Sequence, residues 1–156
     1  MSARWQGVVD GHRDIAFVLA ANGDVIAGNS AYAVLFPSRR RPRNWWRWSL
    51  LDPSREATLT EWHTAWAPRL LADFMLASVR HPHDLVLCSI RSAIQRDPSV
   101  RSVLAADQGI DGTTLPLNHA GRGPGHGHPL IAAGTAATLV TVPFDSLHRQ
   151  APAEPV

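Results

Sequence analysis

Lysine is absent from this chain of 156 residues, and cysteine occurs only once, as Cys88. A single cysteine excludes an intramolecular disulfide bond. No apolar run is long enough to span a membrane, and the N-terminus lacks the apolar core of a signal peptide. The net charge of +2 is too small to indicate a polyanionic partner. These absences predict a cytoplasmic protein without membrane contact, and they argue against a nucleic acid partner.

The remaining composition is typical of one globular domain. Hydrophobic residues make up 45% of the chain and charged residues 18%. A chain of this length buries about two thirds of its unfolded surface in a single domain. Arginine replaces lysine throughout, a usage typical of a high-GC bacterial genome. We therefore expect a packed core rather than a disordered chain.

The tryptophans are concentrated in one segment, residues 39–66. Five of the six tryptophans lie in it, and its first nine residues include five arginines. Arginines beside aromatic side chains can bind nucleic acid, with bases stacked on the indoles. The low net charge and the lack of a second basic segment favour arginines that anchor a loop instead. Because a buried indole needs a partner for its N–H group, the tryptophans are expected to build a core or a cavity wall.

Two strands and a short helix are predicted near the N-terminus. Residues 14–20 form an apolar run of strand formers, and an Asn-Gly-Asp turn at residues 22–24 separates it from a second apolar run at residues 25–27. This pattern predicts a β-hairpin. Asn29 is well placed to cap a short helix that ends before Pro37.

Helices are predicted in the middle of the chain. An Asp-Pro start signal precedes residues 54–80, whose apolar positions at steps of three or four predict one amphipathic helix. A proline within this segment predicts a kink or two abutting helices near Ala67. Further helices are expected over residues 85–96 and, after a second Asp-Pro signal, over residues 99–104.

Strands are predicted again after the helices. Residues 112–117 and 138–142 are rich in β-formers, whereas residues 121–128 have the composition of a flexible Gly/His loop. The order of strands, helices and strands predicts an α+β fold. In this fold a helical layer packs on one face of an antiparallel sheet.

Several motifs, in this order, resemble a known family. The sequence NGDVIAGNSA at residues 22–31 looks like the opening of a PAS-type sensor domain. The motif RNWWRW at residues 43–48, the LDP that follows it, the pair Glu61-Trp62 and the DPS break at residues 97–99 resemble the MmyB-like ligand-binding domain. The resemblance implies a PAS-like fold that encloses an apolar pocket for a small lipophilic molecule.

The resemblance also implies a domain organisation and a function. It divides the chain into an N-terminal extension (residues 1–13), a PAS-like ligand-binding domain (residues 14–146) and a disordered tail (residues 147–156). The family forms the C-terminal half of helix-turn-helix regulators that are abundant in actinobacteria. Since about a dozen residues precede the first strand, we expect a sensor module without its own DNA-binding domain. It would bind a small apolar ligand without a cofactor, and would act through a protein partner or as a homodimer.

An alternative function stays open. The same pocket would suit a cofactor-independent enzyme of specialised metabolism, similar to a cyclase or an isomerase. His63, Asp73 and His119 are the side chains near the expected cavity that could perform acid–base chemistry, although His63 points about 100° away from the aromatic face of its helix. None of them is assigned a catalytic role.

The predicted ligand site is a wall of apolar side chains from the hairpin, the short helix and the long helix. A cavity between a sheet and a helical layer is a common place for a small-molecule site. The predicted lining residues are Phe17, Ile26, Leu35, Trp46, Trp62, Trp66, Leu70 and Phe74.

No metal site is predicted. Two His-x-His pairs, His81/His83 and His126/His128, have the close spacing of metal ligands. Neither pair is joined to a third ligand at a recognisable spacing. Cys88 lies in an apolar helix and is expected to be a small buried hydrophobic residue.

Overall fold

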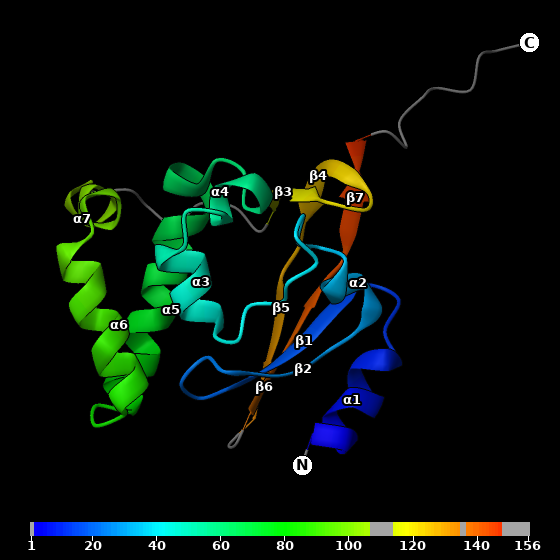
Figure 1. The fold of residues 1–156 in the computed structure, drawn as a ribbon, viewed down its shortest axis with the longest axis horizontal. Helices are drawn as coiled ribbons and strands as arrows, with labels where there is room; N and C mark the ends of the chain where they lie inside the picture. The colour runs from blue at the N-terminus through cyan, green and yellow to red at the C-terminus, as the bar shows by residue number, and fades with distance from the viewer. Residues whose placement is uncertain (1, 107–113, 135–136, 148–156) are drawn as a thin grey trace, which may run out of the picture.

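The computed structural model describes residues 2–106, 114–134 and 137–147, which fold into two antiparallel sheets and a set of helices (Figure 1). The larger sheet has the strand order β2-β1-β6-β5, and the smaller sheet has the order β3-β4-β7. The larger sheet consists of β1 (Ile15–Ala20), β2 (Val25–Gly28), β5 (Leu130–Ala133) and β6 (Ala137–Val142). The smaller sheet consists of β3 (Leu115–His119), β4 (Gly123–Gly127) and β7 (Phe144–Ser146). The predicted α+β fold class is confirmed.

β1 lies inside the larger sheet because both of its faces are apolar. Successive side chains of a strand point to opposite faces. Ile15, Phe17 and Leu19 belong to the main core under the helical layer. Ala16 and Val18 belong to a second, smaller core on the other face. The unbroken apolar run of β1 therefore fits a strand that is covered on both sides.

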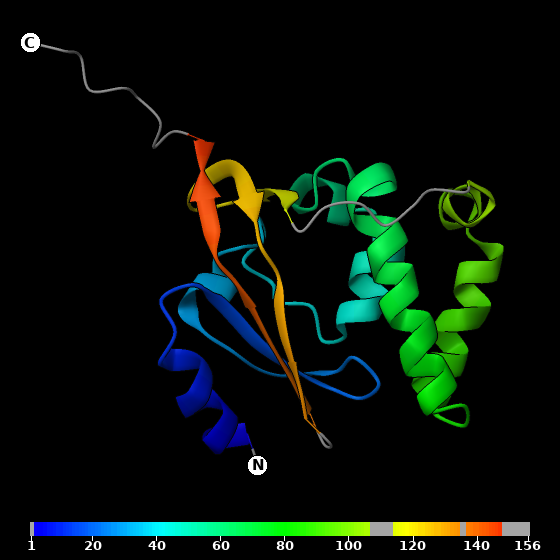
Figure 2. The same ribbon diagram turned by 180° about the vertical axis from the view of Figure 1, so that it is seen from behind.

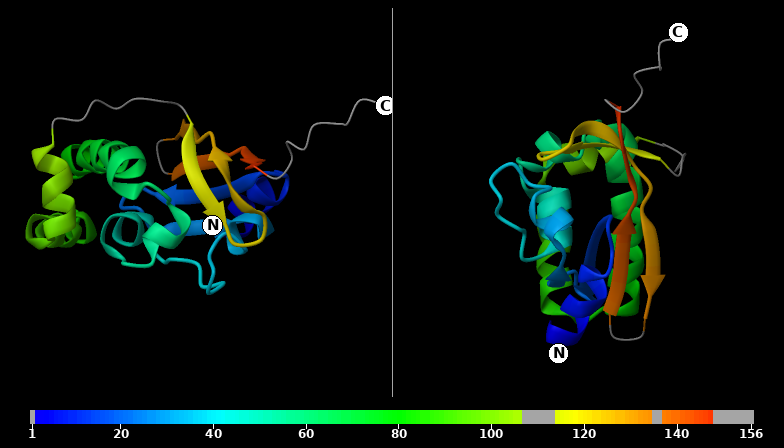
Figure 3. Two further views of the ribbon diagram at one scale, coloured as in Figure 1. Left: turned by 90° about the horizontal axis from the view of Figure 1, so that it is seen from above. Right: turned by 90° about the vertical axis from the view of Figure 1, so that its right-hand side faces the viewer.

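Helix α1 (Ser2–Asp10) covers the outer face of the larger sheet. Val9 is fully buried in the second core, and the Gln6 side chain donates a hydrogen bond to the Gly28 carbonyl at 3.0 Å. Figures 2 and 3 show α1 and the other long helices on opposite sides of the sheet. The segment predicted as an N-terminal extension thus contributes a helix that packs on the domain.

Asn29 begins the short helix α2 (Ser30–Ala33), as predicted. Its side-chain oxygen accepts hydrogen bonds from the backbone N–H groups of Tyr32 at 2.9 Å and Ala16 at 3.2 Å. Its amide group donates to the Asp14 carbonyl at 2.7 Å. One side chain therefore caps α2 and joins it to the start of β1.

The hairpin turn between β1 and β2 fixes the position of the tryptophan-rich segment. Gly23 has a φ of 87°, which a residue with a side chain adopts only with strain. The Asn44 amide donates to the Asn22 carbonyl at 3.0 Å and to the Asp24 carboxylate at 2.9 Å. The Trp45 N–H group donates to the Gly23 carbonyl at 2.8 Å. These bonds hold the start of the next helix against the turn.

The segment over residues 54–80, predicted as an amphipathic helix with a kink or two abutting helices near Ala67, has its helices abutting there but is also interrupted at Glu61, which corrects the prediction upstream of Ala67. Glu61 has a left-handed φ of 55° and interrupts the helical backbone. A π-helical turn follows and continues directly into a regular helix, near the predicted break at Ala67. The elements are α3 (Trp45–Leu51), α4 (Arg55–Thr58), η1 (Trp62–Trp66) and α5 (Ala67–Arg80).

The two following helices agree with the sequence analysis because each begins at a capping aspartate. Asp84 accepts hydrogen bonds from the first backbone N–H groups of α6 (Leu85–Arg96), and Asp97 does the same for α7 (Pro98–Ala105). No helix among the described residues is long and apolar enough to cross a membrane.

The segment predicted as a flexible loop, residues 121–128, mostly forms β4, which corrects that prediction. β4 pairs with β3 and β7. The small Gly125 allows the close approach of β7, because a Cβ there would overlap the Asp145 carbonyl and the Phe144 ring. The strand predicted over residues 112–117 begins at Leu115, and its first two residues lie outside the described part of the chain. The predicted tail beyond residue 147 also lies outside it.

Candidate functional site

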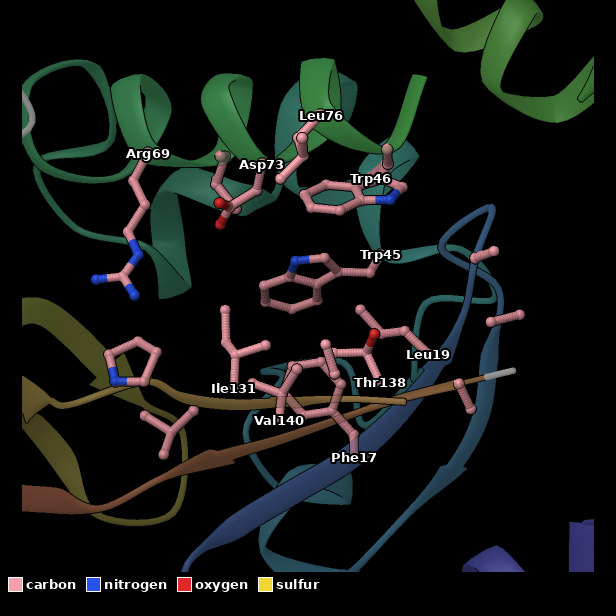
Figure 4. A pocket seen from close by; sticks show the side chains of 18 of the residues that line it. Phe17, Leu19, Trp45, Trp46, Arg69, Asp73, Leu76, Ile131, Thr138 and Val140 are labelled. Atoms are coloured by element: carbon pink, nitrogen blue, oxygen red, sulfur yellow. The ribbon is translucent and has the colours of Figure 1, made fainter. Parts of the chain in front are cut away.

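A cavity of about 310 Å³ lies between the inner face of the larger sheet and the helices α3 and α5 (Figure 4). Its floor consists of side chains from three strands: Phe17, Leu19, Ile131, Thr138 and Val140. These positions alternate along each strand, so they project from the same face. The cavity is therefore framed by the central strand and by the C-terminal strands.

Two lining residues of the cavity, one on α5 and one on the edge strand β5, are exposed at the surface. Leu76 on α5 and Ile131 on β5 both line the cavity and are 50% and 49% exposed. Among the described strands, β5 pairs with β6 alone and forms the edge of the larger sheet. The lining therefore reaches the surface of the described part of the chain both on this strand and on α5.

Trp45 and Trp46 form the aromatic wall at the start of α3. The Asn44 side chain caps this helix by accepting a hydrogen bond from the Arg47 N–H group at 3.0 Å. The Trp45 ring packs against Phe17 with a centroid distance of 4.9 Å. Neither the Trp45 nor the Trp46 indole N–H group has a hydrogen-bond partner among the described residues. Figure 4 shows the Trp45 indole nitrogen on the ring edge that faces α5.

The hairpin turn supports the Trp46 ring directly. A Cβ at Gly23 would overlap Cδ1 of Trp46, so the indole occupies the space that a side chain would need. On its other side, the ring meets Phe74 edge-on at a centroid distance of 6.0 Å. Gly23 therefore serves both the turn and the wall of the cavity.

The other tryptophans of this segment are fixed by their indole nitrogens. Trp48 donates to the Ser54 hydroxyl at 3.2 Å, and Trp62 donates to the Ser49 carbonyl at 2.7 Å. Trp66 donates to the Pro116 carbonyl on β3 at 2.6 Å and also lines the cavity. These bonds tie the helical layer together and join it to the smaller sheet.

The inner face of α5 adds charged groups to an otherwise apolar lining. Arg69 and Asp73 are half-buried, and Figure 4 shows both pointing from α5 towards the sheet. In the described part of the chain, neither side chain makes a hydrogen bond or an ion pair. Burial raises the pKa of the Asp73 carboxyl group above its ordinary value, and the positive charge of Arg69 opposes part of this rise.

Five of the eight predicted lining residues lie in the cavity wall, namely Phe17, Leu35, Trp46, Trp66 and Leu70. The other three are elsewhere. Ile26 packs against the second core on the outer face of the sheet. Trp62 is fully buried beneath the Arg55 guanidinium, which lies 3.9 Å from its ring centroid. Phe74 is fully buried between the helices.

The irregular backbone before α5 explains the position of Trp62. A π-helical turn has more residues than an α-helical turn, so Trp62 does not share the face of α5 that meets the cavity. This face includes Leu70 and Ala77 of the predicted stripe together with Arg69, Asp73 and Leu76, whereas Phe74 does not line the cavity. Nothing in the spacing of the apolar residues indicates that Arg69 and Asp73 face the cavity. For the cavity floor a sequence signal did exist, because Thr138 and Val140 alternate along the predicted C-terminal strand and so share one face.

His119 is buried but does not line the cavity. Its Nδ1 atom accepts a hydrogen bond from the Gly121 N–H group at 3.0 Å, so Nε2 carries the hydrogen that is donated to the Ala31 carbonyl at 3.2 Å. Burial lowers the pKa of His119, the bond to Ala31 opposes this effect, and the charge of Arg122 adds to it. This is a neutral structural histidine.

Of the remaining candidates, His81 lines the cavity at the end of α5, and the others lie outside it. His63 is exposed, 3.8 Å from the Glu56 carboxylate. His126 lies opposite Asp145 in the smaller sheet, and His128 is 3.6 Å from the same carboxylate. No group of three His, Cys, Asp or Glu side chains in the described segments is arranged to hold a metal ion. Cys88 is half-buried on α6 rather than fully buried.

The arginines near the tryptophans contact neighbouring elements. The Arg47 guanidinium donates to the Ser89 hydroxyl at 3.1 Å, and that of Arg41 reaches the Gly28 carbonyl at 3.5 Å. Such bonds agree with arginines that anchor a loop and a helix.

A comparison with known families completes the description of the site. The family model of the MmyB-like transcription regulator ligand binding domain matches residues 1–123 of the 156-residue chain. This range includes α1, the hairpin and all of the helices that cover the cavity. No curated protein sequence matches the chain. On the family match, this chain belongs to the MmyB-like transcription regulator ligand binding domain family.

Proposed function

We propose that the domain binds an apolar small molecule between the larger sheet and the helices α3 and α5, as the sensor module of a regulator. The observation that carries this proposal is the cavity of about 310 Å³, whose lining is predominantly aliphatic and aromatic. Cavities of this size are typical of small-molecule sites. Membership of a ligand-binding family supports a ligand, and the apolar lining supports its lipophilic character.

The energetic basis is the burial of apolar surface. Each Å² of apolar ligand surface removed from water contributes about 25 cal/mol. The Trp45 and Trp46 rings can pack against an alkyl or aryl group without breaking a hydrogen bond, because their N–H groups have no protein partner among the described residues. The wall is therefore suited to contact with a guest molecule.

The sensor role needs a route from the cavity to a partner. α5 lines the cavity with one face and exposes Met75 and Val79, 49% and 73% exposed, on another. A ligand that shifts α5 would change this surface, which a protein partner or a second copy could detect. This step, the PAS-like character of the module and its cytoplasmic location are parts of the proposal.

Native mass spectrometry of the purified protein tests the proposal. We expect the protein to retain an unchanged apolar molecule, either co-purified or added. Trp66→Ala should weaken this retention because it opens the cavity wall, whereas Trp5→Ala, on α1 across the sheet, should not. Equal retention by both variants would place the ligand elsewhere.

The alternative, a cofactor-independent enzyme, rests on Asp73. A carboxyl group with a raised pKa inside an apolar cavity is a plausible general acid or base for an isomerisation. Chromatography of the small molecule recovered after incubation separates the two functions, because isomers have the same mass but different retention. Release of an isomeric product, dependent on Asp73, would favour the enzyme over the sensor.

A further inference from the structure

We propose that the ligand carries an uncharged head group with both a hydrogen-bond donor and an acceptor, such as a primary carboxamide, and that this group binds between Arg69 and Asp73. The inference rests on the proposed function, because it assigns the polar end of a ligand whose apolar part fills the same cavity.

The placement of the two side chains is the first step. Arg69 and Asp73 are four residues apart on α5, so their Cβ atoms lie about 5–6 Å apart on the same face. Both line the cavity and both point towards the sheet (Figure 4). In the described segments they do not pair with each other, although Arg69 is the charge that acts on Asp73. Their polar atoms are therefore directed at the space that a ligand would occupy.

Ligand entry makes this arrangement selective. Both charged groups are half-buried, so they keep contact with solvent while the cavity is open. An apolar molecule that enters displaces this water, and a charged group left without a partner in a dehydrated site is costly. A ligand that provides a partner for each of the two groups should therefore bind more tightly than one that leaves either group without a partner.

The opposite signs of the two groups determine which head group can do so. A carboxylate accepts hydrogen bonds from Arg69 but is repelled by the neighbouring Asp73, and an ammonium group has the reverse problem. A carboxamide oxygen can accept from the guanidinium while its NH₂ group donates to the carboxylate. Bonds of this kind to charged groups are the stronger class of hydrogen bond.

The other ionisable residues of the lining do not change this balance. Among the described lining residues, these are Arg80 and His81. Both are exposed at the C-terminal end of α5, seven or more residues beyond Asp73. Solvent therefore screens their charges from the polar end of the cavity.

Isothermal titration calorimetry with three ligands that differ only in the head group tests the inference. Decanamide, decanoate and decylamine present the same alkyl chain with a neutral, a negative and a positive end at neutral pH. We expect decanamide to bind the wild-type protein at least about tenfold more tightly than either charged ligand, the difference made by one hydrogen bond to a charged group.

Two variants should reverse the preference. Asp73→Asn removes the repulsion, so decanoate should gain at least about tenfold relative to decanamide. Arg69→Gln should give decylamine the corresponding gain. Arg96→Gln is the control, since it removes a charge from an exposed position of α6 that does not line the cavity and should leave the order of the three ligands unchanged.

The outcomes are distinct. Tightest binding of decanamide with both reversals supports the inference. Wild-type binding of decanoate or decylamine as tight as that of decanamide overturns it and leaves the proposed function intact. Failure of all three ligands to bind contradicts the proposed function of the cavity, and the inference with it.

Discussion

Trp62 and Trp46 lie in the same tryptophan-rich segment but occupy two different kinds of environment. Trp62 is fully buried, its N–H group is bonded to the Ser49 carbonyl at 2.7 Å, and the Arg55 guanidinium covers its ring. Trp46 is half-buried and lines the cavity, and its N–H group has no hydrogen-bond partner among the described residues. We call Trp62 a framework residue, because its contacts belong to the packed core, and Trp46 a wall residue, because it borders the cavity.

The difference shows that a cluster of aromatic residues can divide its roles within a few turns of chain. An indole N–H group that donates to a buried carbonyl group stabilises the fold, because breaking that hydrogen bond leaves the carbonyl group without a partner. A ring without such a bond contributes mainly contact area, which a ligand can share. Trp66 combines the two roles, since it lines the cavity and donates to Pro116.

Replacement of the framework tryptophan should have the largest effect on stability. Trp62→Ala removes a buried aromatic side chain and should lower the free energy of unfolding by about 3–5 kcal/mol. Trp46→Ala should cost less, because the ring is half-buried and its N–H group has no hydrogen bond to another described residue that would be lost. Urea denaturation measures both variants. Equal losses would remove the distinction between framework and wall.

Support of the wall by the hairpin turn is tested by Gly23→Ala. The new Cβ would be forced into a left-handed backbone and against the Trp46 ring, so the free energy of unfolding should fall by at least about 1 kcal/mol. Gly7→Ala is the matched control. No atom lies within 4 Å of a Cβ placed there, on an exposed position of α1, so a gain of about 0.5–1 kcal/mol is expected. A tolerated Gly23→Ala would mean that Trp46 is not held in this position.

The stability of the fold should depend on pH through His119, which is buried outside the cavity. The pKa of His119 is lower in the folded state than its ordinary value of 6.5, so the unfolded chain takes up the proton first. Stability should therefore be complete above that pH and decline as the pH falls below it. His119→Gln keeps a donor and an acceptor and should flatten this dependence. His83→Gln, at an exposed site, should leave it unchanged. Thermal melts across this pH range measure the effect, and a decline that persists in His119→Gln would assign it to other groups.

Asp73, which lines the cavity, should give the stability of the fold the opposite pH dependence, with a smaller effect. Its pKa is higher in the folded state than the ordinary value of 3.8, so the folded chain binds the proton more tightly. Its contribution to stability is present at low pH and is lost as the pH rises above that value. Asp73→Asn should therefore be more stable than the wild type at neutral pH, with the difference vanishing in acid. Asp14→Asn, outside the cavity, is the control. A destabilised Asp73→Asn would indicate a partner for the carboxylate.

The parts of the fold that sequence could predict are those with local causes. Helix α6 runs from Leu85 to Arg96 as predicted, because the cap at Asp84 and the apolar spacing lie within the segment itself. Asn29 caps α2 for the same reason. The hairpin was also recognisable, since the Asn-Gly turn lies between its two strands.

The parts that could not be predicted depend on distant contacts or on irregular backbone. Ile26 was predicted to face the cavity, but strand pairing places it on the outer face, and a single strand does not define which face is inward. The left-handed Glu61 and the π-helical turn place Trp62 away from the face of α5 that meets the cavity. β4 was predicted as a loop because its glycines have low strand propensity, yet they allow close pairing with β7.

The most direct test of the central claim is to fill the cavity and measure ligand binding. Ala77→Phe places a ring in the cavity lining, whereas Ala72→Phe places the same ring on an exposed position of the same helix. The probe is the neutral apolar dye N-phenylnaphthylamine, whose fluorescence rises when it leaves water. The wild type and Ala72→Phe should bind it equally, and Ala77→Phe should bind it at least about tenfold more weakly. Equal binding by all three proteins would contradict the assignment of this cavity as the ligand site.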